Sequence, residues 1–221
     1  MAIDIGHTRT QPGATSARGA AEWGFNAALA QRVQAALQAT GVAQVVINGA
    51  GDPIGLKDRP AAAERGGASL LVSLHHDSAQ PQYLTPWTWE GKPRLFSERF
   101  SGFGLFVSGK NAEPEESTRV AIAVGDKLLA EGLRPSLHHA ELIPGEGRPV
   151  LDAERGIYQY DDLVVLKYAS MPAVLVEAGV IINRQDETVI ATDAYRDRIA
   201  HAIAAAAAEH CRRVEMGLSI R

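Results

Sequence analysis

The sequence predicts an α/β domain, because short apolar runs rich in Val, Ile and Leu alternate with longer segments of helical period. The chain has 221 residues, of which 46% are hydrophobic and 22% charged, values that are ordinary for a globular protein. We therefore expect one domain covering residues 1–221, with its sheet largely buried. The strands are expected at Ala2–Gly6, Ala43–Asn48, Ser69–Leu74, Gly102–Ser108 and Ala173–Val176.

Three segments predict long helices between and after these strands. The first covers Ala20–Thr40 and ends at Gly41, a residue that readily adopts the left-handed backbone of a helix C-terminus. The second runs from Pro114, a favourable first-turn residue, to Glu131. The third covers Asp193–Val214, and its apolar stripe predicts that it covers one face of the sheet; the stripe consists of Tyr195, Ile199, Ile203 and Ala206.

Composition and charge exclude several classes of protein. Lys and Arg number 22 against 26 Asp and Glu, so the net charge is −4, which disfavours a nucleic-acid binder. The single cysteine, Cys211, allows no internal disulfide. No run of about twenty apolar residues predicts a transmembrane segment. Met1 is followed directly by a strand-like run, so the chain is expected either to be made without a secretion signal or to have lost one.

Two segments predict irregular structure. Gln80–Ser101 contains three prolines together with Trp87, Trp89 and Phe96, and it is too aromatic for a passive linker. We expect it to form a loop over a site, either bordering a substrate groove or filling a satellite core with its tryptophans. Pro135–Tyr160 is rich in Gly, Pro and charged residues and is expected to be a second loop.

Ionisable residues follow three of the predicted strands. His7 follows the first strand, His75 and His76 follow the third, and Glu177 follows the last. Ligands of open α/β sheets bind beyond the carboxyl ends of the strands. We therefore expect these residues to share one site.

Two carboxylates stand where apolar residues are expected. Glu177 lies alone in an apolar run, so it must be ion-paired, bound to a metal or protonated; a structural salt bridge to an arginine is the alternative to a functional role. Glu22 lies one turn ahead of Phe25 at the start of the buried stripe of the first helix. Its alternative role is to complement the positive end of the helix dipole.

Two histidines, one carboxylate and a further carboxylate match the residues of a catalytic zinc site, which has three protein ligands and a general base. The other histidines are ranked lower. His76 should point away from His75 and pack or cap, whereas His138 and His139 could approach the site from the second loop. His201 and His210 are expected to be structural, and Cys211 inert.

Four stretches resemble one known family. They are IDIGH with PGA at Pro12–Ala14, Glu22 followed by Asn26 and Leu29, LLVSLHHDS at Leu70–Ser78, and LKYASMPAVLVEAGVIIN at Leu166–Asn183. Together, in this order, they resemble the zinc-dependent N-acetylmuramoyl-L-alanine amidases of the amidase-3 type over nearly the whole chain.

The resemblance implies a role for each candidate residue. It assigns His7, Glu22 and His75 as zinc ligands and Glu177 as the catalytic carboxylate. It also implies a mixed, mostly parallel sheet of about six strands flanked by helices. The implied reaction is hydrolysis of the amide between N-acetylmuramic acid and L-alanine, with peptidoglycan or muropeptides as substrate. The implied location is the periplasm or cell envelope, if a signal has been removed.

Two other functions remain open at this stage. A related zinc enzyme could cut a different amide, as a carboxypeptidase or an amidase for soluble muropeptides. A wall-binding module without catalysis could use the same fold. Some members of the family carry an inserted helix that blocks the site until a partner withdraws it. Neither loop here contains a clear amphipathic helix, so we expect an uninhibited site, and the sequence identifies no regulatory partner.

Overall fold

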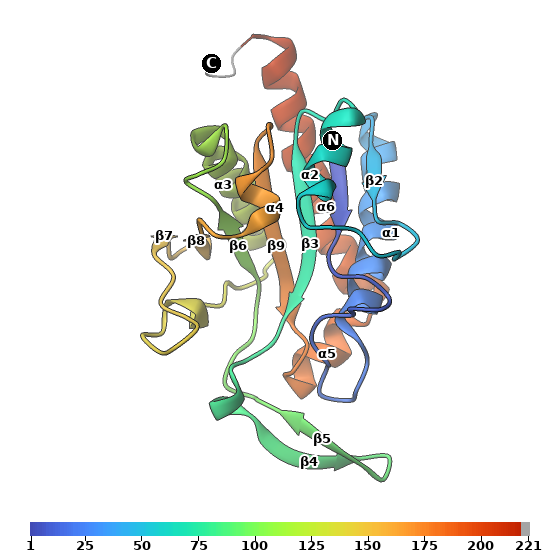
Figure 1. Ribbon diagram of the computed structural model, residues 1–221, viewed down its shortest axis with the longest axis vertical. Coiled ribbons are helices and arrows are strands. Elements are labelled where there is room, and N and C mark those ends of the chain that lie inside the picture. Colours follow the sequence, from blue (N-terminus) through green and yellow to red (C-terminus); the bar gives the residue numbers. More distant parts are fainter. Residues whose placement is uncertain (218–221) are drawn as a thin grey trace.

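The computed structural model describes residues 1–217 and places a seven-stranded sheet at the centre of this part of the chain (Figure 1). In spatial order its strands are β2 (Val45–Ile47), β1 (Ala2–Ile5), β3 (Leu71–Asp77), β9 (Ala173–Val180), β6 (Gly104–Val107), β8 (Ile157–Gln159) and β7 (Val150–Asp152). The first four strands run parallel, β6 is antiparallel to β9 and parallel to β8, and β7 is antiparallel to β8. The predicted mixed, mostly parallel α/β sheet is confirmed.

Helices cover both faces of the sheet. One face packs against α1 (Glu22–Thr40), α3 (Pro114–Ala130) and α6 (Asp193–Glu215), and the other against α2 (Asp58–Arg65) and α4 (Val164–Lys167). A further short helix, α5 (Arg184–Ile190), follows β9. In Figure 1, α2 and α4 lie over the upper part of their face, and neither helix reaches the lower part.

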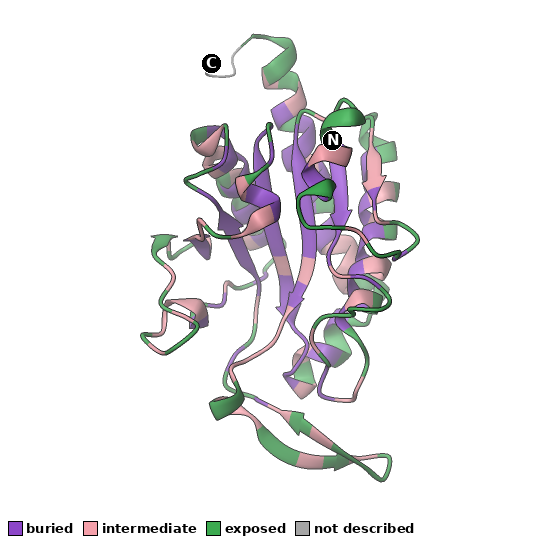
Figure 2. Ribbon diagram, viewed as in Figure 1, coloured by how far each residue is buried: buried purple, intermediate pink, exposed green. Residues whose placement is uncertain are grey.

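Alternation along the strands divides the core in two. On β3, Val72 and Leu74 join the cluster under α1, α3 and α6, whereas Leu71 joins the cluster under α2 and α4. Because side chains alternate between the two faces of a strand, His75 belongs to the α2 and α4 face and His76 to the opposite one. Figure 2 shows the central strands buried almost throughout their length.

The strands around the site are longer than predicted. β3 extends through His75 to Asp77, and β9 extends through Glu177 to Val180. We expected His75 and Glu177 to follow their strands, but both residues lie within them. Because these positions are polar, a search for apolar runs does not detect the ends of the two strands.

The segment Gln80–Ser101 is not an irregular loop, contrary to the prediction. It contains a short 3₁₀ turn (Pro81–Tyr83) and an antiparallel hairpin of β4 (Thr85–Trp89) and β5 (Lys92–Phe96). Glu90 and Gly91 both have positive φ, which suits a two-residue hairpin turn. Pro86 pairs with Leu95, and Pro93 pairs with Thr88 two residues further along the ladder. Every second pair of an antiparallel ladder makes no backbone hydrogen bonds, so both prolines can lack an N–H without the loss of such a bond.

The second predicted loop also contains regular structure. Within Pro135–Tyr160, β7 and β8 extend the sheet at one edge, and His138–Ala140 forms a 3₁₀ turn. Neither of the two segments contains an α-helix among its residues, all of which the structure describes. Among residues 1–217, no helix is both long and apolar enough to cross a membrane.

The packing of α1 predicts the effect of a core substitution. Leu37 is fully buried, so Leu37→Ala should lower the free energy of unfolding by about 2–5 kcal/mol through lost burial and the cavity left behind. Leu142, which is 94% exposed, provides the control, and Leu142→Ala should change stability by less than about 0.5 kcal/mol. Urea unfolding of both variants measures the difference, and equal midpoints would contradict the assigned packing.

Candidate metal centre and active site

His7 lies just past β1 in a backbone conformation that is uncommon for a residue with a side chain. Its φ is 65°, and its carbonyl accepts hydrogen bonds from Asn48 Nδ2 and, at 2.7 Å, from Arg59 Nη2. The Arg59 guanidinium is itself buried and ion-paired with Asp4 at 2.6 Å. This network holds the strained turn, and the centre of the His7 ring lies 4.9 Å from the centre of the His75 ring.

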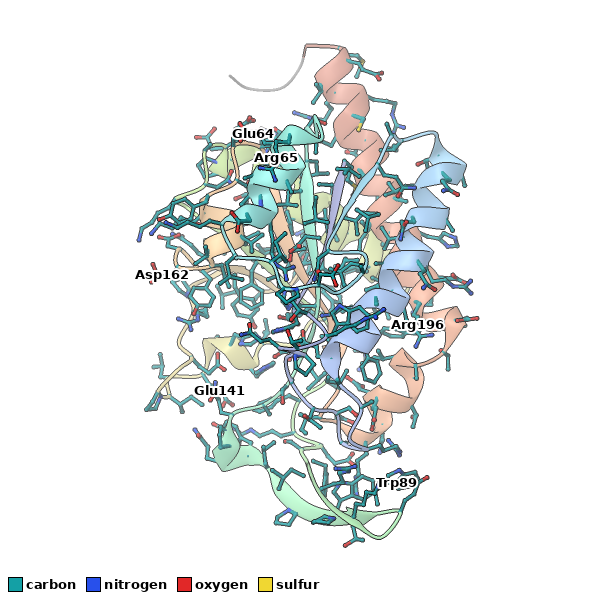
Figure 3. The ribbon with its side chains drawn as sticks, turned by 45° about the vertical axis from the view of Figure 1, so that its right-hand side comes forward. Glu64, Arg65, Trp89, Glu141, Asp162 and Arg196 are labelled. Atoms are coloured by element: carbon teal, nitrogen blue, oxygen red, sulfur yellow. The ribbon has the colours of Figure 1, made fainter. Side chains whose placement is uncertain are left out.

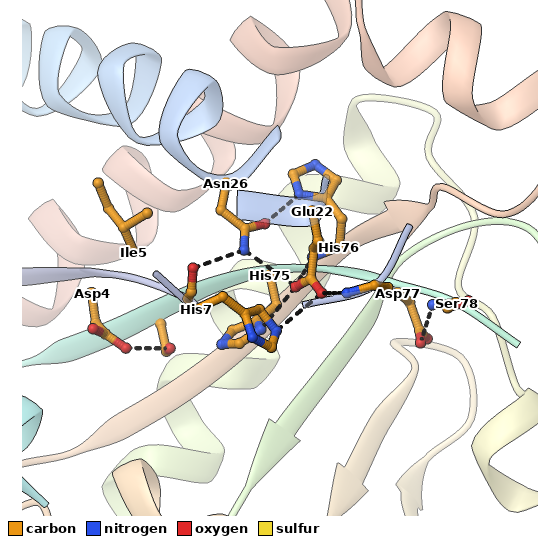
Figure 4. Close-up of polar contacts among 12 residues, drawn as sticks. Asp4, Ile5, His7, Glu22, Asn26, His75, His76, Asp77 and Ser78 are labelled. Carbon is orange, nitrogen blue, oxygen red and sulfur yellow. Dashed lines mark hydrogen bonds and ion pairs between the residues drawn. The ribbon is translucent and has the colours of Figure 1, made fainter. Parts of the chain in front are cut away.

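Glu22 is the first residue of α1, and its carboxylate is buried (Figure 4). Its oxygens lie within 3.3 Å of five nitrogens, which are Nε2 of His7, Nδ1 of His75, Nδ2 of Asn26 and the backbone N–H groups of Ala14 and His76. Burial by itself would raise the pKa of Glu22, but the hydrogen bonds from the two histidines outweigh burial and lower this pKa. The carboxylate therefore stays ionised at neutral pH. The alternative role of Glu22, which was only to complement the helix dipole, does not account for these contacts.

His76 packs on the opposite face, as predicted. Its Nδ1 lies 2.7 Å from Asn26 Oδ1, and its ring lies against Phe25. Burial lowers the pKa of His76 to about 3, so the ring is neutral at physiological pH. His76 is a core residue that orients Asn26, which in turn donates to Glu22.

Glu177 lies beside His75 across the parallel β3–β9 pair, on the same face of the sheet. No ion pair among residues 1–217 involves Glu177, and its Oε2 atom is buried without a hydrogen-bond partner. Burial raises the pKa of Glu177 well above its ordinary value, and the nearby charges of Asp77 and Glu22 raise it further. The structural salt bridge that the sequence left open is absent from the described residues.

The side chains of His7, Glu22 and His75 fit a bound cation. Their donor atoms all lie within 4.8 Å of one another, and the set of two imidazoles and one carboxylate is typical of zinc. Two glycines leave room for these rings and oxygens. A Cβ atom on Gly6 would collide with the His75 ring, and one on Gly13 would collide with Glu22 and His7. Gly6 and the glycine of the PGA motif are therefore steric requirements of the site.

The amidase-3 model, described as N-acetylmuramoyl-L-alanine amidase, matches residues 1–209. The chain belongs to this family. Among its relatives, AmiA of Salmonella typhimurium is 28% identical over 213 residues, which cover 91% of this chain and 72% of that protein. AmiA of Escherichia coli is 27% identical over 92% of this chain and 73% of the relative.

Solved structures of amidases share the fold of this amidase-3 chain. AmiC2 of Nostoc punctiforme superposes with a TM-score of 0.71 at 24% identity, covering 96% of each chain. An amidase from Clostridium difficile 630 gives a TM-score of 0.73 at 21% identity, covering 96% of this chain and 95% of that one.

A second cluster of histidines and acids lies next to the site, at the end of β3. Asp77 Oδ2 lies 2.7 Å from His139 Nε2 and 3.1 Å from His138 Nε2. His139 Nδ1 contacts Glu146 at 2.8 Å, and His138 Nδ1 contacts the Ser136 hydroxyl, also at 2.8 Å. This cluster ties the loop of residues 137–149 to the end of β3. Of the two histidines that could approach the site, His139 lines a pocket together with Glu177.

The acids and histidines of this cluster stabilise one another's charged forms. Burial alone would lower the pKa of His139, but its hydrogen bonds to Asp77 and Glu146 outweigh burial and raise this pKa to about 9. Burial alone would raise the pKa of Asp77, but the two histidines lower it to about 2. At neutral pH, His139 is therefore a cation between two carboxylates.

The hairpin tryptophans of this amidase-3 chain pack against arginines. Trp87 Nε1 donates to the Ala17 carbonyl at 3.1 Å, and the Arg18 guanidinium lies 4.8 Å from the Trp89 ring. Figure 3 labels Trp89 on the hairpin below the sheet. These contacts fit a satellite core, while neighbouring Arg94 and Leu95 line a separate surface pocket with Ala14–Ser16.

Sequence reasoning missed the role of Asp77 and of the buried Asp4–Arg59 pair. Asp77 directly follows the two histidines of the LHHDS stretch, so its position on β3 was a usable signal. No pattern in the sequence links Asp4 to Arg59, because 55 residues separate the partners.

The raised pKa of His139 predicts a pH-dependent contribution to stability. Protonation of His139 stabilises the fold fully below pH 6.5, and this contribution is lost as the pH rises through about 9. His139→Gln should therefore lower the melting temperature most near pH 6 and least near pH 9.5.

The exposed His201 provides the control for this experiment. His201→Gln should leave the melting temperature within about a degree of the wild type at each pH. A His139→Gln deficit that stays constant from pH 6 to 9.5 would show that the ring contributes by packing and not by charge.

Proposed function

We propose that this chain catalyses zinc-dependent hydrolysis of the amide between N-acetylmuramic acid and L-alanine in peptidoglycan. The observation that carries the proposal is the convergence of His7, Glu22 and His75 beside Glu177, a carboxylate without an ion-pair partner in the described residues. Membership of the amidase family and two related proteins named as amidases support the choice of bond.

His7, Glu22 and His75 would hold the zinc ion. Zinc bound there would supply a Lewis acid that polarises the scissile carbonyl and acidifies a water molecule. The hydrogen bonds from Ala14 and Asn26 hold the Glu22 carboxylate in one orientation, and Asn48 and Arg59 hold the backbone of His7. Such outer contacts fix the geometry of the ligands before the cation arrives.

Glu177 would act as the general base and then as the general acid. Its Oε2 atom has no other hydrogen-bond partner, so it is free to accept a proton from water and to return it to the leaving amine of L-alanine. The raised pKa of Glu177 suits both halves of this task, since a carboxylate near its ordinary pKa gives up a proton readily but accepts one poorly.

The proposal assigns the catalytic domain to residues 1–221, of which 218–221 lie outside the described residues. The substrate would be peptidoglycan or soluble muropeptides, and the place of action would be the periplasm or cell envelope. Neither segment flanking the site contributes a blocking helix, which supports an open site.

Metal analysis tests the ligand set. The wild-type protein should purify or reconstitute with one zinc per chain, and His75→Ala should lose most of it, because two remaining ligands hold zinc poorly. His201→Ala, far from the site in sequence and exposed, should keep the full amount. Undiminished zinc in His75→Ala would remove His75 from the metal site.

A second experiment separates the roles of the two carboxylates. Glu177→Gln should fold and keep its zinc but release muropeptide products at least about 10²-fold more slowly, because general base catalysis typically contributes 10²–10⁴-fold. Glu22→Gln should instead bind zinc weakly, because a neutral amide is a poorer ligand than a carboxylate, and excess zinc should restore part of its activity.

The measurements are zinc stoichiometry and mass spectrometry of the products from intact sacculi and from soluble muropeptides. Cleavage must leave a free alanine amine. Loss of metal in Glu177→Gln, with metal and activity retained in Glu22→Gln, would reverse the assignment. No cleavage of either substrate by the zinc-loaded wild type would contradict the proposed function.

A further inference from the structure

A pocket of about 140 Å³ opens beside Glu177, on the side away from His7. Its walls are aromatic and aliphatic and are formed by Phe106, Tyr160, Leu163 and Leu175. Polar residues line it as well, namely Glu177, Arg148, Glu146 and His139. A group held in this pocket would therefore lie next to the proposed general base.

Arg148 is a cation without an acidic partner. Its guanidinium lies 3.6 Å from the centre of the Tyr160 ring, and Nη2 donates to the Gly145 carbonyl at 3.0 Å. Within residues 1–217, Arg148 takes part in no ion pair. Stacking on Tyr160 orients the guanidinium plane and leaves several N–H donors for a ligand.

Glu146, a second acid that lines this pocket, already has polar partners. Glu146 accepts a hydrogen bond from Gln80 Nε2 with one oxygen and contacts the His139 cation with the other. On the far side of the metal ligands, a pocket of about 270 Å³ contains Arg59, but this arginine is paired with Asp4. Of these two pockets, the one beside Glu177 therefore offers a cation that has no ion-pair partner among residues 1–217.

Arg148 is also held in place relative to the strand that carries His75. Its backbone N–H donates to the His139 carbonyl at 2.7 Å, and the His139 ring contacts Asp77 at the end of β3. Glu141, labelled in Figure 3, lies in the same loop and is itself anchored to Arg99. The loop that carries Arg148 is thus held by contacts of His139 and of Glu141.

We propose that this pocket is the peptide subsite and that Arg148 binds a carboxylate of the stem peptide on the leaving-amine side. The inference rests on the proposed function. The muramoyl side of the bond offers neutral sugar and lactyl groups, whereas the peptide side carries free carboxylates. A guanidinium pairs with a carboxylate through two parallel N–H···O bonds, and the apolar walls would accept the peptide's methyl and methylene groups.

A pair of soluble substrates tests the proposal. One is N-acetylmuramoyl-L-alanyl-D-glutamic acid, and the other is the same compound with both glutamate carboxylates converted to amides. The wild type should prefer the acid by about tenfold in kcat/KM, mainly through KM, which corresponds to about 1.4 kcal/mol. Arg148→Gln should hydrolyse both compounds with similar kcat/KM.

Two further variants exclude indirect effects. Arg148→Lys keeps the charge but not the paired donors, so it should retain part of the preference. Arg212→Gln removes an exposed arginine near the end of α6 and should keep the whole preference. Melting curves should show that Arg148→Gln is folded. A wild type that cuts both compounds equally, or an Arg148→Gln protein that still prefers the acid, would overturn the proposal while leaving the proposed function intact.

Binding provides a readout that does not depend on turnover. Calorimetry with L-alanyl-D-glutamic acid and with its diamide should show tighter binding of the acid by the wild type but not by Arg148→Gln. If the zinc-loaded protein cleaves neither muramoyl compound, this titration alone decides the subsite, and the proposed function is decided by the digestion of sacculi and muropeptides. Equal binding of acid and diamide by the wild type would then overturn the subsite.

Discussion

The site depends on one buried carboxylate, that of Glu22. Burying an ion is costly, and here five nitrogens from four separate parts of the chain offset that cost. Each of these donors is already constrained by its own surroundings, such as the strained turn at His7 or the pairing of β3 with β9. Because the carboxylate requires all of them at once, it joins the start of α1 to the carboxyl ends of the strands.

Residues on the two faces of β3 have different roles: those on one face belong to the candidate site and its loop, and those on the other to the core. His75 and Asp77 project to the open face, where one contacts Glu22 and the other holds the loop of residues 137–149. His76, between them, projects into the core and is kept neutral by burial. These three consecutive polar residues therefore make three different sets of contacts. A shift of the strand by one residue would exchange their roles, so the β3–β9 register is a condition for the site.

Most of the fold, and the residues that the structure brings together at the candidate site, could be predicted from the sequence for specific physical reasons. The apolar period placed the five main strands and three long helices, and Glu22 and Glu177 stood out because acids are costly in apolar runs. The β4–β5 hairpin was missed because its strands carry prolines and its turn is Glu90–Gly91, not a familiar Asn-Gly pair. The Asp77–His139–Glu146 chain was missed because ion pairs between distant residues leave no periodic signal.

Strand β9 is central in the sheet but late in the sequence, so the sheet cannot be completed until most of the chain has been synthesised. His7, Glu22 and His75 all lie within the first 75 residues, but β9, the second neighbour of β3, begins only at Ala173. Until β9 leaves the ribosome, β3 and β6 each lack the neighbour that separates them in the finished sheet. Two buried-type strands with open edges are prone to pair with other chains. Between the synthesis of β6 and that of β9, the chain therefore has two strands whose shared neighbour has not yet been made.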